Sequence, residues 1–276
     1  MEGCSLRVVT WNIRAGIGPG EPFPACWWRR IRRDRFEAIA AFIRGLDADV
    51  VVLQEVALGT VDGSTLDQPA ELARLTGLEA RYAALHHYTL VDPDRERAVG
   101  AVLWGNALLS RLPIVATTAQ ALPVPADDDL VEPGGVRYAD AGMGPREARV
   151  ALEASVSAGG RSIRVVGTHL AYVGHEQRRV QVDAVVGLAG PTDPLIVAGD
   201  LNAAVEDPEL EPLRGALVDA FEATGTAPAD PARESCGRQR IDHVFVRGFE
   251  PITCRVVREA GDLSDHWPVV AELQPP

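Results

Sequence analysis

The chain has 276 residues, of which 46% are hydrophobic and 24% charged, and its formal net charge at pH 7 is −12. It contains no run of about 18 apolar residues and no charged start followed by an apolar segment, which argues against a membrane span and a secretion signal. The acidic balance disfavours broad, sequence-independent adhesion to a polyphosphate, although a bound divalent cation would reverse the local field.

The first part of the sequence predicts two buried strands separated by a helix. Residues 6–13 are β-rich and carry Asn12 near their end. Apolar residues at three- and four-residue steps predict a helix over residues 31–43, and residues 49–56 form a second apolar run that ends near Glu55. Glutamate is depleted from strands and costly to bury without a cation or hydrogen-bond partners, so Glu55 is a candidate metal ligand.

A Gly- and Pro-rich loop over residues 16–24 precedes this helix. It leads to Trp27, Trp28 and a basic cluster at residues 29–35. The two tryptophans either form a wall that stacks on a substrate or pack under the loop, and packing is the favoured interpretation. The arginines are typical of a solvated helix face, with a local phosphate-binding patch as the alternative.

The middle of the chain combines regular elements with two loops. We expect a helix and two strands at residues 66–77, 80–90 and 99–104. Residues 105–114 are interpreted as a turn-rich passage, in which Asn106 either faces a phosphate or caps a loop. Residues 123–145 are rich in Pro, Gly and Asp and show no strand pattern, so we interpret them as a long surface excursion.

Two paired strands follow the excursion. The first, over residues 146–156, has Arg146 and Arg149 near its start, and its hairpin partner over residues 161–169 ends on His169. A single histidine at a strand end is more often a satisfied structural group than a catalyst.

A helix over residues 175–188 leads to the most apolar strand, which starts at Leu195. Asp200 and Asn202 leave the end of this strand two residues apart, so in extended backbone both side chains point the same way. An isolated Gly-Asp-x-Asn sequence is usually only a turn.

The last part of the chain adds two further polar strand ends. A short helix is expected over residues 208–213, and residues 240–246 form a strand with Asp242 near its entry. Asp265 and His266 lie in a turn before the final strand. His243 is expected on the opposite face of its strand from Asp242, and so outside any site.

Each polar strand end has an ordinary structural explanation when it is taken alone. Jointly these explanations are improbable, because open sheets gather their ligands at one set of strand ends. No linker divides the chain, so we expect a single domain over residues 1–276. We also expect a cytoplasmic monomer, with the location inferred from the lack of a membrane span and a secretion signal. Reduced thiols are expected because no metal spacing or compact disulfide pattern connects Cys4, Cys26, Cys236 and Cys254.

The chain resembles bacterial members of the endonuclease/exonuclease/phosphatase superfamily, which have the deoxyribonuclease-I-like fold. Seven short motifs carry the resemblance, in the family's order: Thr10-Trp11-Asn12, Leu53-Gln54-Glu55, Gly105-Asn106-Ala107, Thr168-His169-Leu170, Gly199-Asp200-Leu201-Asn202, Arg240-Ile241-Asp242 and Ser264-Asp265-His266. The resemblance implies an α/β fold, a four-layer α/β/β/α sandwich of two packed mixed sheets flanked by helices. It also implies hydrolysis of a phosphoester with Mg²⁺ or Mn²⁺.

Oxygen ligands and the lack of a cysteine cluster suit such a hard cation. Glu55 is the first expected ligand. Asn12 would add an amide oxygen or orient Glu55, and Asp265 is a further candidate ligand. Asn106 and Arg146 are the expected substrate-binding residues.

The reaction implied is in-line attack of water on phosphorus. Asp200 would orient or deprotonate the water, and Asn202 would donate a hydrogen bond to the phosphorane oxygens. His169 and His266 would flank the phosphate, with one of them protonating the leaving oxygen. Asp242 would hold His266 in the useful tautomer and raise its pKa.

The sequence also narrows the subfamily. A histidine at Thr168-His169-Leu170 disfavours an apurinic-site endonuclease, and the sequence before Asp242 lacks the Trp-Thr-Asp-Arg motif of inositol polyphosphate 5-phosphatases. The favoured hypothesis is a phosphoesterase on a small or lipid-like phosphodiester, or on a phosphomonoester. The alternatives are a nuclease that acts on DNA or RNA with the same machinery, and a non-hydrolytic enzyme or scaffold on the same fold.

Overall fold

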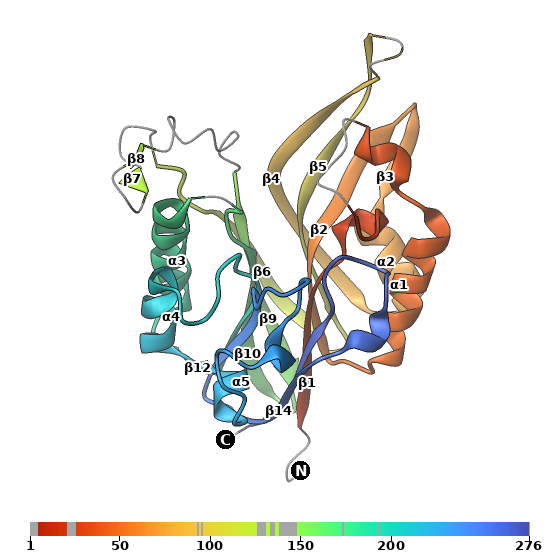
Figure 1. The fold of residues 1–276 in the computed structure, drawn as a ribbon. Helices are drawn as coiled ribbons and strands as arrows, with labels where there is room; N and C mark the ends of the chain where they lie inside the picture. The colour runs from red at the N-terminus through yellow and green to blue at the C-terminus, as the bar shows by residue number, and fades with distance from the viewer. Residues whose placement is uncertain are drawn as a thin grey trace.

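Two mixed β-sheets pack face to face and carry helices on their outer faces (Figure 1). The computed structural model describes residues 5–20, 26–92, 94, 96–125, 131–132, 136–137, 148–172, 174–192 and 194–275. The four-layer α/β/β/α sandwich expected from the sequence is therefore confirmed.

The first sheet contains the chain's N-terminal and C-terminal strands side by side. In spatial order it consists of β14 (Glu250–Val256), β15 (Val269–Gln274), β1 (Leu6–Asn12), β2 (Val50–Val61), β5 (Arg97–Ser110) and β4 (Glu79–Asp92), with β3 (Ser64–Asp67) paired to β2. Strands β1 and β2 are parallel, with Asn12 opposite Gln54, so their carboxyl ends meet at one edge of the sheet.

The second sheet repeats this arrangement around a second parallel pair. Its spatial order is β12 (Val218–Asp219), β13 (Asp242–Arg247), β11 (Leu195–Asp200), β10 (Arg161–His169), β9 (Val150–Ala158) and β6 (Ile114–Ala121). Strands β10 and β11 are parallel, and the register pairs His169 with Asp200. Strand β13 is antiparallel to β11, so Asp242 at its start lies opposite Asp200.

Helices cover the outer face of each sheet (Figure 1). They are α1 (Arg33–Gly45) and α2 (Gln68–Thr76) on the first sheet, α3 (His175–Ala189) and α4 (Glu211–Ala216) on the second, and the short α5 (Ala220–Ala223). Five 3₁₀ turns are also described: η1 (Arg14–Gly16), η2 (Trp27–Arg30), η5 (Pro208–Leu210), η6 (Pro231–Arg233) and η7 (Arg258–Ala260). Among the described residues, no helix has both the length and the apolar character needed to cross a membrane.

The main core lies between the sheets and consists of aliphatic side chains from both inner faces, including Val52, Leu108, Val165 and Ile196. The parallel pairs approach each other closely at Gly167, where an added Cβ would lie 2.7 Å from Val52 Cγ1. Glycine at this position therefore brings the carboxyl ends of the two parallel pairs near each other.

The interpretation of residues 105–114 as a turn-rich passage was wrong, because β5 continues through Ser110. Gly105 is a strand residue here, and a Cβ on it would lie 2.1 Å from the carbonyl oxygen of Ala83 on β4. The glycine therefore permits close approach of two backbones and does not mark a turn.

The tryptophans of the N-terminal loop pack as expected. Trp27 and Trp28 are buried in a cluster with Trp104 and Leu90, beneath the strands β4 and β5. Of the cysteines, Cys26, Cys236 and Cys254 are free thiols, and Cys4 lies outside the described residues.

The excursion at residues 123–145 is described only in part. Residues 126–130, 133–135 and 138–147 lie outside the described residues, and Arg146 falls among them. Two short strands, β7 (Val131–Glu132) and β8 (Val136–Arg137), pair antiparallel within it. The expectation of no strand in this segment was wrong at these positions, because a two-residue pairing is too short to produce a recognisable alternation of apolar and polar residues.

Candidate active site

Polar side chains from both sheets meet at the carboxyl ends of the parallel strand pairs. Asn12 and Glu55 come from the first sheet, and His169 and Asp200 come from the second. Asp242 enters beside Asp200 because β13 is antiparallel to β11. The topology therefore brings together residues that are as far apart as 12 and 242 in the sequence.

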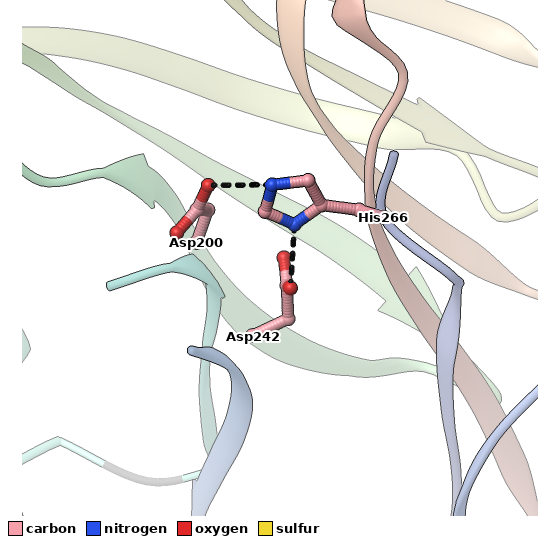
Figure 2. Close-up of side chains that lie close together, drawn as sticks. All are labelled: Asp200, Asp242 and His266. Carbon is pink, nitrogen blue, oxygen red and sulfur yellow. Dashed lines mark hydrogen bonds and ion pairs between the residues drawn. The ribbon is translucent and has the colours of Figure 1, made fainter. Parts of the chain in front are cut away.

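An imidazole lies between two carboxylates at the centre of this group (Figure 2). His266 Nδ1 is 2.8 Å from Asp242 Oδ2, and His266 Nε2 is 3.7 Å from Asp200 Oδ2. All three side chains are buried. Ser235 Oγ donates to Asp242 Oδ2 at 2.6 Å, which fixes the carboxylate that holds the imidazole.

The protonation of this array follows from its charges. Burial alone would lower the pKa of His266, but the carboxylates of Asp242 and Asp200 outweigh burial and hold that pKa well above its ordinary value. Burial, together with the Asp242 carboxylate, raises the pKa of Asp200 to about 6. At neutral pH His266 is therefore a positively charged imidazolium. It lies next to the carboxylate of Asp200, which takes up a proton near pH 6.

Asn12 connects this array to Glu55. Its Nδ2 donates to Glu55 Oε1 at 2.9 Å and to Asp200 Oδ2 at 3.0 Å. Its Oδ1 accepts a hydrogen bond from the backbone amide of Arg14 at 3.1 Å. In this structure Asn12 therefore orients both carboxylates with its amide nitrogen.

Glu55 occupies an irregular position in β2. The register between β2 and β5 shifts between Leu53 and Val56, and Glu55 has a left-handed backbone with φ of 56°. A bulge re-aims a side chain, and a non-glycine residue at positive φ is a strained conformation that is often found at functional sites. Burial raises the pKa of Glu55 to about 7, and its buried Oε2 has no hydrogen-bond partner.

His169 and Asn202 form the second-sheet wall of the site. Asn202, also at positive φ, donates from Nδ2 to His169 Nε2 at 3.1 Å and to the carbonyl of Leu170 at 3.0 Å. Burial lowers the pKa of His169 well below its ordinary value, and the positive charges of Arg149 and His266 lower it further. His169 is therefore a neutral imidazole, and its Nε2 also lies 3.4 Å from Asp200 Oδ2.

Asp265 has a different environment from the other carboxylates. Its Oδ2 pairs with Arg14 Nη1 at 3.1 Å, and its Oδ1 accepts from Ser264 Oγ at 3.2 Å. The Asp265 carboxylate also contributes to the raised pKa of Glu55, so its charge acts at the same place. Sequence reasoning did not identify Arg14, which follows β1 in a left-handed conformation that the residue type does not reveal.

The two residues expected to bind substrate have different outcomes. Asn106 is buried and its Nδ2 donates to the carbonyl of Val150 at 2.8 Å, which ties β5 to β9. Arg146 lies outside the described residues. Arg149 instead lines a pocket beside His169 and Asn106. The pairing of β9 with β10 places Arg149 near the site. Ala151 pairs with Thr168, so Arg149 lies just past the end of β10, where His169 is the last residue.

His243 lies outside this group, as the sequence predicts. Its Nε2 is 2.9 Å from the carbonyl oxygen of Ala203, and burial lowers its pKa.

A family model for the endonuclease/exonuclease/phosphatase family matches residues 9–266, a span that includes every side chain of the site. The chain belongs to the endonuclease/exonuclease/phosphatase family. Members of this family are mostly hydrolytic phosphoesterases and nucleases, and they generally use divalent metals.

Solved structures with the same fold cover almost the whole chain. The endonuclease/exonuclease/phosphatase from Beutenbergia cavernae is 26% identical with a TM-score of 0.70, over 98% of this chain and 72% of that one. The Bacteroides thetaiotaomicron mannosyl-6-phosphatase is 21% identical with a TM-score of 0.64, over 98% and 99% of the two chains. The human Nocturnin catalytic domain with bound sulfate is 19% identical with a TM-score of 0.64, over 98% and 93%. No curated protein matches the chain by sequence.

The residues present suit the divalent metal that the family implies. Glu55 Oε2 is a buried carboxylate oxygen without a hydrogen-bond partner, and a hard cation prefers such oxygen ligands. A second buried group, Asp200, Asp242 and His266, has its ligand atoms within 4.8 Å of one another. In that group the hydrogen bond from Ser235 and the contact with His266 occupy Asp242 Oδ2, whereas the buried Asp242 Oδ1 has no hydrogen-bond partner.

Proposed function

We propose that the chain is a Mg²⁺- or Mn²⁺-dependent phosphoesterase that hydrolyses a small phosphodiester or phosphomonoester by in-line attack of water. The observation that carries this proposal is the amide of Asn12, which bonds the carboxylates of Glu55 and Asp200 at once. It holds an orphaned carboxylate oxygen suited to a cation beside a second carboxylate suited to a water molecule. Phosphoryl transfer needs this positioning and charge stabilisation more than covalent chemistry.

Glu55 would hold the divalent cation, with Asp265 as a further candidate ligand. Asn12 would orient Glu55, because its Nδ2 donates to Glu55 Oε1 while its Oδ1 accepts from the Arg14 amide. When bound, the cation would stabilise the negative charge on the phosphoryl oxygens.

Asp200 would orient the attacking water and accept its proton. Its pKa of about 6 lies near the operating pH, where a general base combines an ionised state with useful basicity. The backbone amide of Asn202 donates to Asp200 Oδ1 at 3.0 Å, so Oδ1 is fixed while Oδ2 faces Asn12 and His266. This leaves the carboxylate with a single defined orientation.

His266 would donate a proton to the leaving oxygen. It carries the positive charge that an acid needs, and Asp242 holds its Nδ1 so that Nε2 faces Asp200 (Figure 2). Neutral His169 would flank the phosphate as a hydrogen-bond donor to a phosphoryl oxygen. Both amide hydrogens of Asn202 are directed to His169 Nε2 and to the carbonyl of Leu170, so Asn202 would position His169.

A small substrate is favoured over a long nucleic acid. Three arginines of the basic cluster pair with neighbouring acidic residues: Arg29 with Asp92 and Asp94, Arg32 with Asp34, and Arg33 with Glu37. Their charges are therefore partly compensated and do not form the basic stripe that binding to a polyphosphate chain requires.

Hydrolysis of bis(4-nitrophenyl) phosphate and of 4-nitrophenyl phosphate tests the proposal. Each rate is measured with Mg²⁺, with Mn²⁺ and with chelator, for the wild type, Asp200→Ala and the exposed control Asp183→Ala on α3. We expect metal-dependent release that falls by roughly 10²- to 10⁴-fold in Asp200→Ala and is unchanged in Asp183→Ala. Equal rates in the wild type and Asp200→Ala would refute the assignment of the base.

A further inference from the structure

The backbone that follows His169 is held by side chains of α3. Strand β10 ends at His169, and the last backbone bond to β11 runs from the Leu170 amide to the carbonyl of Asp200 at 2.9 Å. The polar backbone groups of Ala171 and Tyr172 lie beyond this pairing, and such groups need partners when they are buried. Side chains of α3 supply these partners, so the helix fixes the loop directly after a residue of the candidate active site.

Gln181 binds the first of these backbone groups. Its Oε1 accepts from the amide of Ala171 at 2.9 Å, and its Nε2 donates to the carbonyl of Pro123 at 3.3 Å. The side chain is fully buried, so an apolar residue in its place would leave the Ala171 amide without a partner. Gln181 thus joins the loop after β10 to the segment that follows β6.

Arg178 joins the same loop to the one after β11. Its Nη1 donates to the carbonyls of Ala171 and Tyr172 at 3.3 and 3.1 Å, and its Nε donates to Glu209 Oε1 at 3.0 Å. Glu209 lies in η5, which follows the loop that carries Asn202. The loops after β10 and β11 are therefore linked through one buried ion pair.

Apolar burial does not hold the end of the loop, because Tyr172 is 71% exposed. Closer to the site, the carbonyl of Leu170 accepts from Asn202 Nδ2 at 3.0 Å, and the same nitrogen lies 3.1 Å from His169 Nε2. A shift of the Leu170 backbone would therefore move the Asn202 amide away from the imidazole. A misplacement of about 1 Å in a catalytic site can lower the rate by roughly 10²-fold.

We propose that Gln181 and Arg178 are positioning residues for the reaction. They fix His169 and Asn202 through the backbone of residues 170–172. The proposal rests on the proposed phosphoesterase function, in which His169 flanks the phosphate. It extends the set of functional residues from the strand ends to the N-terminal half of α3.

Hydrolysis by Gln181→Met tests the proposal. Gln181 is chosen because removal of Arg178 would also remove the buried cation that pairs with Glu209 and would destabilise the fold by itself. Methionine has a similar length, but its thioether is only a weak acceptor for the Ala171 amide. We expect kcat to fall roughly 10- to 10²-fold, with a much smaller change in KM.

A conservative variant separates positioning from stability. Gln181→Glu keeps an acceptor oxygen for the Ala171 amide and should restore most of kcat, although burial of a carboxyl group makes it less stable than Gln181→Met. The control Val185→Ala removes buried apolar packing from the same helix and should lower the thermal unfolding midpoint without lowering kcat. If kcat follows the unfolding midpoint across these variants, Gln181 has a structural role only and the proposal is overturned.

Nuclear magnetic resonance of ¹⁵N-labelled histidine tests the same contact without turnover. The ring signals of His169, assigned by their loss in His169→Gln, should shift or broaden in Gln181→Met and return toward the wild-type positions in Gln181→Glu. The signals of His243, whose Nε2 lies 2.9 Å from the carbonyl oxygen of Ala203, should stay in place. Unchanged His169 signals in Gln181→Met would overturn the proposal. If the wild type hydrolyses neither ester, the proposed function fails, and these signals still show whether Gln181 positions His169.

Discussion

Replacing Glu55 with glutamine is expected to abolish metal-dependent hydrolysis and to leave the fold intact. Glutamine has the same shape and can still accept from Asn12, but it lacks the charge that a divalent cation needs. The charged form is already disfavoured by burial, so its removal does not destabilise the protein. We expect kcat/KM to fall by roughly 10³-fold or more, because a catalytic metal supplies several kcal/mol of charge stabilisation.

Two measurements on this variant separate metal loss from misfolding. Electron paramagnetic resonance of Mn²⁺ should show weaker binding in Glu55→Gln, while its thermal unfolding midpoint stays close to that of the wild type. The control Glu272→Gln removes a half-buried carboxylate on β15 that pairs with Arg7 and should leave metal binding unchanged. Near-normal turnover in Glu55→Gln would contradict the assignment of the metal ligand.

Loss of Asp242 and loss of His266 are expected to be strongly non-additive. Among the described residues, the Asp242 carboxylate is hydrogen-bonded to His266 Nδ1 and to Ser235 Oγ, both through Oδ2, and its charge also raises the pKa of Asp200. Each single change to alanine should lower kcat by roughly 10²- to 10⁴-fold. The double variant should be about as slow as His266→Ala alone, because Asp242 acts through the imidazole.

A double-mutant cycle in kcat measures this coupling. The comparison cycle pairs His266→Ala with Asp183→Ala, whose exposed carboxylate lies on α3 and pairs with Arg179, and these two effects should simply multiply. If the Asp242→Ala and His266→Ala effects also multiply, the two residues act independently, and Asp242 does not work by holding His266.

The regular parts of the fold were predictable because burial leaves a direct pattern in the sequence. The run before Asp200 and the run before Glu55 are continuous apolar strands, and α1 buries Phe36, Ile39 and Ile43 at helical spacing. The parallel pairing and the meeting of two sheets were not visible in these patterns. They came from the resemblance to the family.

Irregular backbone accounts for what the sequence did not reveal. Gly105 and Asn106 have turn composition, yet they lie within β5 opposite a bulge in β2. The same bulge gives Glu55 its positive φ, which the residue type disfavours and only the folded surroundings enforce. The residue types at Gly105 and Asn106 alone cannot distinguish a turn from a strand whose backbone lies close to that of its neighbour.

The candidate site was predictable by residue type but not by role. Sequence motifs identified Asn12 and Glu55, but the donor role of the Asn12 amide toward two carboxylates appears only in three dimensions. Arg14 and Arg149 were not assigned, because a guanidinium near a strand end is usually a surface group. Their burial is a property of the assembled sandwich and leaves no mark in the local sequence.

Hydrolysis in ¹⁸O-enriched water most directly tests the claim that these side chains direct water to phosphorus. The phosphodiester substrate is hydrolysed under single-turnover conditions with Mg²⁺. The products are separated, and their masses are measured by mass spectrometry. We expect one solvent oxygen to enter the phosphoryl product and none to enter the alcohol, and we expect neither product when a chelator is present. Incorporation into the alcohol, or release that persists without a metal ion, would contradict metal-dependent attack of water at phosphorus.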